Sequence, residues 1–149
     1  MLSAVVVLLA VPATAQAEAW YIQQASPTQV VALDREAVSW AEDLPSFELL
    51  ALTPAGAGSG SDIRTRIRLN CPARKFQVLG LTLSARVNGE EITSQQTLPS
   101  PSWFVIETGS AVASAESLIC HGRNDLGHRP LKSLSELRSV VGSASKARP

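Results

Sequence analysis

The sequence predicts an α+β fold that is mainly β: an antiparallel sheet of about six strands, one disulfide-tethered helix and a C-terminal helix. Three observations lead to this fold class. Residues 63–71 alternate apolar and basic side chains with the period of a half-buried strand. Asn88-Gly89 is a strong signal for a two-residue hairpin turn. Apolar residues between 111 and 121 recur at helical spacing and lead to one of the two cysteines.

The chain has 149 residues, which is enough for one domain and its core. Its 13 basic residues balance its 13 acidic residues. A dedicated nucleic-acid binder needs a basic excess for its phosphate contacts, and an acidic solvating tail needs the opposite excess. The balance therefore argues against both classes.

Residues 1–17 have the composition of a signal peptide. A short apolar run is followed by Ala15-Gln16-Ala17, the small-x-small pattern that precedes a cleavage site. The run from Ala4 to Val11 is far shorter than the roughly 20 residues of a membrane-spanning helix. We therefore expect export, with a single β-rich domain over 18–141 and a disordered tail over 142–149. No cysteine lies near the cleavage point, so a lipid anchor is not expected. The protein is expected to be periplasmic or secreted, and association with the cell surface is left open.

Export changes the interpretation of the two cysteines, Cys71 and Cys120. In an oxidising compartment two thiols favour a disulfide over a metal or redox site. Closing a loop of about fifty residues is expected to stabilise the fold by roughly 3–4 kcal/mol. The alternative is two unpaired buried cysteines.

The first third of the chain is expected to form three strands. Residues 19–24 open with aromatic, extended character, and Ser26-Pro27-Thr28 turns the chain. Residues 29–33 carry β-branched side chains on both parities, which predicts burial on both faces. Residues 37–40 fit either a short strand or a helical turn, which Pro45 ends in either case. Residues 47–53 form the next strand.

Residues 54–62 are rich in Gly and Ser and predict a loop between two strands. The run Gly58-Ser59-Gly60 is not a phosphate-binding loop. That motif needs a Lys followed by Ser or Thr and then a helix, whereas Asp62 here begins a strand.

The strand from Ile63 to Cys71 carries the first candidate binding residues. Ile63, Ile67, Leu69 and Cys71 share one face, and the opposite face carries a row of arginines: Arg64, Arg66 and Arg68. Their spacing of roughly 7 Å follows from the rise of a strand. Such a row can bind an acidic protein or an acidic glycan. The alternative is a solvated strand face whose arginines pair with Glu or Asp on the neighbouring strand.

Residues 75–87 are too long and too mixed in parity for one flat strand, which predicts a bulge near Gly80. The turn at Asn88-Gly89 leads into a return strand over 90–98. After the break at 99–101, residues 103–106 form the last strand. Trp103 and its neighbour Phe104 point to opposite faces of a strand, so one of them is expected to face inward. An exposed Trp can anchor a partner, which makes Trp103 the fourth candidate binding residue.

Two helices follow. Ser110 is the expected N-cap of a helix over 111–121, with Cys120 beside its apolar side. A second helix is expected from about Leu131 to Val141, stopped by Gly142. Ser133 and Glu136 have capping-box spacing, which leaves Leu134 as the alternative start.

No catalytic constellation emerges from the sequence. His121, Asp125 and His128 have a spacing that can bring metal ligands together on a helix, but the glycines among them favour exposed loop residues. No Gly-x-Ser-x-Gly motif occurs. The adjacent carboxylates at 42–43 and 90–91 point to opposite faces of a strand, which does not suit an acid–base pair. We expect neither enzyme activity nor a metal or other cofactor.

The order of features between Trp20 and Cys120 resembles that of the surface-adhesin protein E family of small bacterial envelope proteins. The shared features are an early aromatic strand, Asn70-Cys71 after a strand, the segment 73–76, a strand pair around Asn88-Gly89, Trp103 with Ile106, and Gly109-Ser110 before a helix that ends at Cys120. The resemblance implies an antiparallel sheet packed by a helix, an envelope location and, for the namesake member, adhesion to host extracellular-matrix and serum proteins. No binding residue is carried over from that family.

The expected function is therefore a non-catalytic envelope binding or interaction module that uses a sheet face or edge. Its expected partner is a protein or an acidic glycan, with no nucleic acid and no membrane span after processing. The alternative is a periplasmic carrier of a small apolar ligand, which would need a cavity within the sheet.

Overall fold

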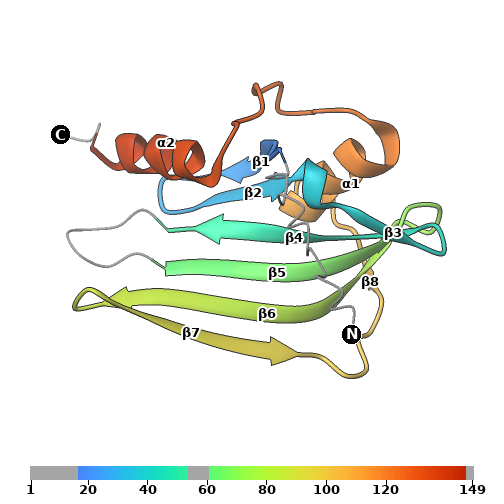
Figure 1. Ribbon diagram of the computed structural model, residues 1–149. Helices are drawn as coiled ribbons and strands as arrows, with labels where there is room; N and C mark the ends of the chain where they lie inside the picture. The colour runs from blue at the N-terminus through green and yellow to red at the C-terminus, as the bar shows by residue number, and fades with distance from the viewer. Residues whose placement is uncertain (1–16, 54–60, 147–149) are drawn as a thin grey trace, which may run out of the picture.

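In the computed structural model, which describes residues 17–53 and 61–146, a six-stranded antiparallel sheet has the order β1-β2-β4-β5-β6-β7 (Figure 1). Two short strands complete it, because β3 pairs with β4 and β8 pairs with β6. The strands are β1 (Trp20–Ala25), β2 (Val30–Asp34), β3 (Ser39–Ala41), β4 (Leu44–Leu52), β5 (Ser61–Asn70), β6 (Lys75–Val87), β7 (Glu90–Thr97) and β8 (Phe104–Val105). The helices are η1 (Arg35–Ala37), α1 (Ala111–His121) and α2 (Leu134–Lys146). This confirms the predicted fold class. Within these ranges no helix is both long and apolar enough to cross a membrane.

The sheet is buried on both faces where β2 and β4 lie, as the mixed parity of residues 29–33 predicted. On one face, Val31, Leu33 and Leu49 pack in a cluster with Leu118 of α1. On the other face, Ala32, Leu50 and other side chains pack against Leu137 and Val141 of α2. In Figure 1, α2 lies beside β1 and β2, whereas α1 is a separate helix that contacts β1. Each helix therefore covers a different face of the sheet.

A disulfide bond attaches α1 to the sheet, as predicted. Cys71 directly follows β5, Cys120 lies in the last turn of α1, and their Cα atoms are 5.9 Å apart. The start of α1 is fixed by Ser110, whose hydroxyl accepts a hydrogen bond from the Ala113 N–H at 3.1 Å. Both ends of this helix are therefore held by interactions that the sequence predicted.

The second helix begins at the alternative start, Leu134. The hydroxyl of Ser133 accepts the Glu136 N–H at 3.1 Å, while the Glu136 carboxylate accepts the Lys132 N–H at 2.7 Å. These reciprocal bonds satisfy backbone donors at the helix start.

The long strand β6 contains the predicted bulge. Arg66 pairs with Gly80 but Ile67 pairs with Val78, so Leu79 is the extra residue. A Cβ on Gly80 would lie 2.8 Å from the Gln96 carbonyl oxygen of β7. The hairpin turn after β6 has φ angles of 52° at Asn88 and 85° at Gly89, as a two-residue type I′ turn requires.

We expect Gly80→Ala to lower the free energy of unfolding by about 1–3 kcal/mol, because the new methyl group overlaps a backbone atom that cannot move without disturbing the β6–β7 pairing. Urea denaturation checks this value. Gly142→Ala is the matched control: it places the same methyl group within α2, where nothing lies within 4 Å. The control is expected to stabilise the fold by about 0.5–1 kcal/mol. Equal effects of the two substitutions would contradict the close approach at Gly80.

Three local predictions were wrong. Pro45 does not end the preceding element: β3 ends at Ala41, Glu42 and Asp43 turn the chain with positive φ angles, and Pro45 lies within β4. Gly142 does not stop the second helix, because a glycine in a helix costs only about 1 kcal/mol and α2 is held by the buried Val141 on its apolar side.

Neither Trp103 nor Phe104 faces inward, since they are 40% and 51% exposed. Strand β8 is only two residues long and pairs with β6 at Lys75 and Phe76, and the residue that enters the core here is Ile106, directly after the strand.

Some predicted segments lie outside the described residues. These are the signal peptide up to residue 16, the loop over 54–60, and residues 147–149 of the predicted tail.

Candidate functional site

The arginine row of β5 lies on the face of the sheet that α2 covers, and we call this surface the arginine face. Its β5 members are Arg64, Arg66 and Arg68, which alternate with the buried Ile67 and Leu69. The sequence predicted this arrangement. The environments of the three guanidinium groups differ, and that difference could not be predicted from the strand alone.

Arg64 is neutralised by a neighbour on β4. Its Nη1 lies 3.6 Å from Oε2 of Glu48, and both side chains are partly exposed. This is the alternative interpretation of the row, an arginine paired with an acid on the adjacent strand, and it holds for this residue. A signal for it existed, because Glu48 is the one acidic residue in the predicted strand over 47–53.

Arg66 and Arg68 differ from Arg64. Arg66 is exposed, and its side chain has no hydrogen-bond or ion-pair partner in the described part of the chain, although Glu48 is its register neighbour. The Nε of Arg68 is buried and likewise has no hydrogen-bond partner within residues 17–53 and 61–146. Of the row, Arg66 is therefore the arginine that is both exposed and without an acidic partner in the described part of the chain.

A groove of about 410 Å³ runs beside this row. Its wall opposite the arginines is acidic and comes from Glu18 and Asp34, with Leu134 at the start of α2. Arg64, Arg66 and Glu48 line the other side. Arg68 and Trp103 are not among the lining residues. The structure thus brings two of the four candidate binding residues together in one groove.

Trp103 lies in the segment before β8, where Phe104 pairs with Phe76 and their ring centroids are 5.6 Å apart. Extending this register by one residue places Trp103 opposite Gln77, which is the register neighbour of Arg68. Trp103 therefore belongs to the edge of the arginine face rather than to the groove.

The acidic wall was not predicted from the sequence. Glu18 Oε2 accepts hydrogen bonds from the Trp20 indole N–H and from the Leu134 N–H, each at 2.9 Å. These two donors, with a smaller contribution from the charge of Arg64, lower the pKa of Glu18 below its ordinary value. Asp34 Oδ1 accepts the backbone N–H groups of Ala19 at 3.0 Å and Glu36 at 3.1 Å. The bonds from Leu134 to Glu18 and from Ala19 to Asp34 join segments that are distant in sequence, and no local sequence pattern predicts them.

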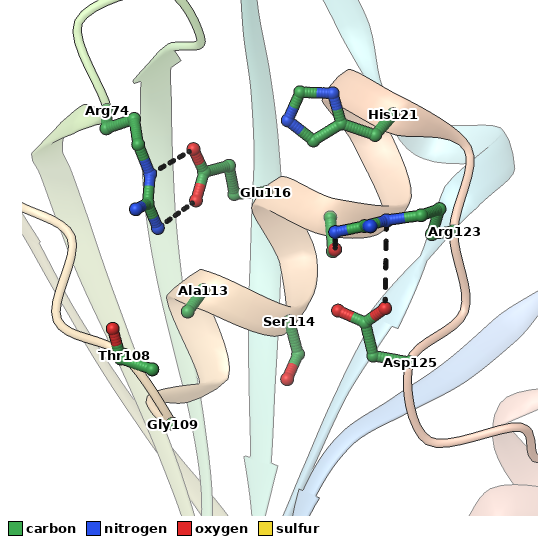
Figure 2. A pocket seen from close by; sticks show the side chains of 10 residues that line it. Arg74, Thr108, Gly109, Ala113, Ser114, Glu116, His121, Arg123 and Asp125 are labelled. Carbon is green, nitrogen blue, oxygen red and sulfur yellow. Dashed lines mark hydrogen bonds and ion pairs between the residues drawn. The ribbon is translucent and has the colours of Figure 1, made fainter.

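A second hollow, of about 520 Å³, lies beside α1 (Figure 2). Arg74 donates two hydrogen bonds of 3.1 Å to the carboxylate of Glu116, which is 4% exposed. These bonds and the charge of Glu116 raise the pKa of Arg74. In a separate group, Arg123 and Asp125 point toward each other (Figure 2). The Nε of Arg123 lies 3.9 Å from Oδ1 of Asp125, and its Nη2 donates to the hydroxyl of Ser117. Each arginine here already has an acidic partner, which favours a structural role for this hollow.

The three residues with metal-ligand spacing do not form a metal site. His121 ends α1 and lines the hollow together with Asp125, whereas His128 lies in the following loop and is exposed. Asn124 donates to the His128 carbonyl at 2.7 Å, which folds the loop on itself. In the described ranges no group of three His, Cys, Asp or Glu side chains could hold a metal ion.

Comparison of the chain with protein-family models, with curated proteins and with solved structures found no match in any of the three. The choice between the two hollows therefore depends on charge. In the hollow beside α1 the arginines are paired. In the groove, Arg66 has no acidic partner, and no basic side chain lies within ion-pair distance of Glu18 or Asp34 among the described residues. The groove and the arginine face around it are the stronger candidate for binding.

Proposed function

We propose that this protein is an exported, non-catalytic binding module whose arginine face binds an acidic group of a partner protein. The observation that carries the proposal is Arg66, an exposed arginine with no acidic partner among the described residues. Export is supported by the leader-like composition of residues 1–17 and by the disulfide, a bond typical of oxidising compartments. A binding role is also what the resemblance to surface-adhesin protein E implies.

The charges around Arg66 favour a protein over an acidic glycan. Three carboxylates line the groove beside the arginines: those of Glu18, Asp34 and Glu48. A polyanionic glycan laid along the face would meet these like charges, which lowers its affinity. A protein can instead present one acidic side chain to Arg66 and neutral or basic groups elsewhere.

The alternative function, a carrier of a small apolar ligand, requires an apolar cavity. No feature of the described residues favours that function over binding at the surface. The groove and the hollow beside α1 are both lined in part by charged side chains. The apolar side chains on the two faces of β2 and β4 pack against α1 and α2.

A capture experiment with matched variants tests the proposal. The protein is immobilised and exposed to extract of its own cell envelope, and retained proteins are compared between the unchanged protein, Arg66→Ser and Arg129→Ser. Arg129 is exposed and lies in the loop between α1 and α2, so its replacement removes the same charge elsewhere. We expect at least one envelope protein to be retained by the unchanged protein and by Arg129→Ser but lost with Arg66→Ser.

Two outcomes would overturn the proposal. One is retention that Arg66→Ser and Arg129→Ser leave equally unchanged. The other is retention on heparin at physiological salt that exceeds retention of every envelope protein, which would make the partner an acidic glycan. Circular dichroism of both variants checks that the sheet is intact.

A further inference from the structure

The groove beside Arg66 has two walls of opposite charge, and the charge of Arg64 on the basic side lowers the pKa of Glu18 on the acidic side without an ion pair between them. One wall carries the carboxylates of Glu18 and Asp34, and the other carries Arg66. No ion pair links the two walls in the described residues, since the pairs on this face are Arg64 with Glu48 and Arg138 with Asp62.

The separation of the walls follows from the strand register. Leu33 of β2 pairs with Leu49 of β4, and Glu48 pairs with Arg66 of β5. Extending the β2–β4 register by one residue places Asp34 opposite Glu48, so Asp34 and Arg66 lie in one row two strands apart. Neighbouring strands are about 4.8 Å apart, which puts these two backbone positions roughly 10 Å from each other. Between them, Glu48 is held by Arg64.

The acidic wall is fixed in place before any ligand arrives. The Trp20 indole and the Leu134 N–H hold Glu18, while two backbone N–H groups hold Asp34. Both bonds to Glu18 go to Oε2, and both bonds to Asp34 go to Oδ1. The other carboxylate oxygens, Oε1 of Glu18 and Oδ2 of Asp34, therefore have no hydrogen-bond donor among the described residues. Removal of a leader at Ala17 would add one α-ammonium group near these two carboxylates, and an excess of one negative charge would remain. Groups ordered in advance lose less entropy on binding.

We propose that this groove binds a mixed-charge peptide segment of the partner, with an acidic side chain on Arg66 and a basic side chain against Asp34 and Glu18. The proposal rests on the function proposed above and specifies the chemistry of the partner. A peptide in the polyproline II conformation fits the row, because residues three apart along it lie on the same side and are separated by roughly 9 Å.

Three capped hexapeptides test the proposal: Ser-Glu-Ala-Ala-Lys-Ser, Ser-Glu-Ala-Ala-Glu-Ser and Ser-Lys-Ala-Ala-Lys-Ser. Binding is followed by nitrogen-15 NMR of the mature protein through two reporters, the Trp20 indole N–H and the Arg66 Nε–H. We expect the mixed-charge peptide to bind about two- to fivefold tighter than either like-charge peptide, the gain of one exposed ion pair. It should shift both reporters, whereas the two-Glu peptide should shift mainly Arg66.

Asp34→Asn provides the matched variant. It removes the charge and keeps the side-chain oxygen that accepts the Ala19 and Glu36 N–H groups. We expect it to abolish the preference for the mixed-charge peptide and to tighten binding of the two-Glu peptide. Asp43→Asn is the control, since it makes the same change at the β3–β4 turn, where a φ of 62° suits asparagine.

The possible failures are distinguishable. If the mixed-charge peptide binds no tighter than the two-Glu peptide, or if Asp34→Asn behaves like Asp43→Asn, this inference is wrong while the function proposed for Arg66 stands. If none of the peptides shifts the Arg66 Nε–H signal, this inference is overturned. The function proposed for Arg66 then depends on the capture experiment.

Discussion

Replacing Cys71 and Cys120 together by alanine is expected to lower the free energy of unfolding by about 4 kcal/mol. The bond closes a loop with a sequence separation of 49 residues, and its loss restores the conformational freedom of that loop in the unfolded chain. It also detaches the last turn of α1 from the end of β5. For a domain of this size the melting temperature should fall by roughly 10–20 °C.

Calorimetry under non-reducing conditions measures this effect. The unchanged protein melted in the presence of a reductant is the control, and it should approach the melting temperature of the double variant. A double variant that melts with the unchanged protein would show that the disulfide does not stabilise the fold.

Leu137→Ala is expected to destabilise the protein by about 2–5 kcal/mol. Leu137 is fully buried and contributes the centre of the cluster between α2 and the sheet, where Trp20 and Leu50 also pack. Truncating it leaves a cavity that these rigid neighbours fill only in part. The effect should reach the groove as well, since α2 supplies the Leu134 N–H that holds Glu18.

Val140→Ala is the control for this prediction, because Val140 lies on the same helix but is 41% exposed. Its effect is expected to stay within about 0.5 kcal/mol. Equal destabilisation by the two substitutions, measured by urea denaturation, would mean that α2 does not pack on the sheet through Leu137.

Most of the fold could be predicted because its signals are local. The alternation along β5, the turn at Asn88-Gly89 and the cap at Ser110 each involve residues close together in the chain. The bulge at Gly80 was predicted for a related reason, since a period of two cannot place Phe76 and Leu81 on one face without an extra residue.

The assignment of each helix to a face could not be predicted. Residues 29–33 required cover on both faces, but nothing in their pattern states that α1 covers Leu33 and that α2 covers Leu50. Gly142 illustrates the same limit: a residue that favours helix ends remains helical when the neighbouring Val141 is buried against the sheet.

The candidate site was predicted in part. The arginines were found from the period of β5. Trp103 was named because an exposed Trp can anchor a partner, but its exposure of 40% was not predicted. The acidic wall was missed because it joins segments that are distant in sequence: Glu18 accepts the N–H of Leu134 in α2, 116 residues away. Charge balance between distant segments is a tertiary property, and a single sequence does not display it.

Arg66 is the residue proposed to receive the acidic group of the partner. Titration calorimetry of the captured partner against the unchanged protein, Arg66→Ser and Arg64→Ser tests it most directly. Since Glu48 already neutralises Arg64, we expect Arg66→Ser to weaken binding at least about tenfold, as for a hydrogen bond to a charged group, and Arg64→Ser to weaken it less. Equal affinities of the unchanged protein and Arg66→Ser for the partner would contradict this role of Arg66.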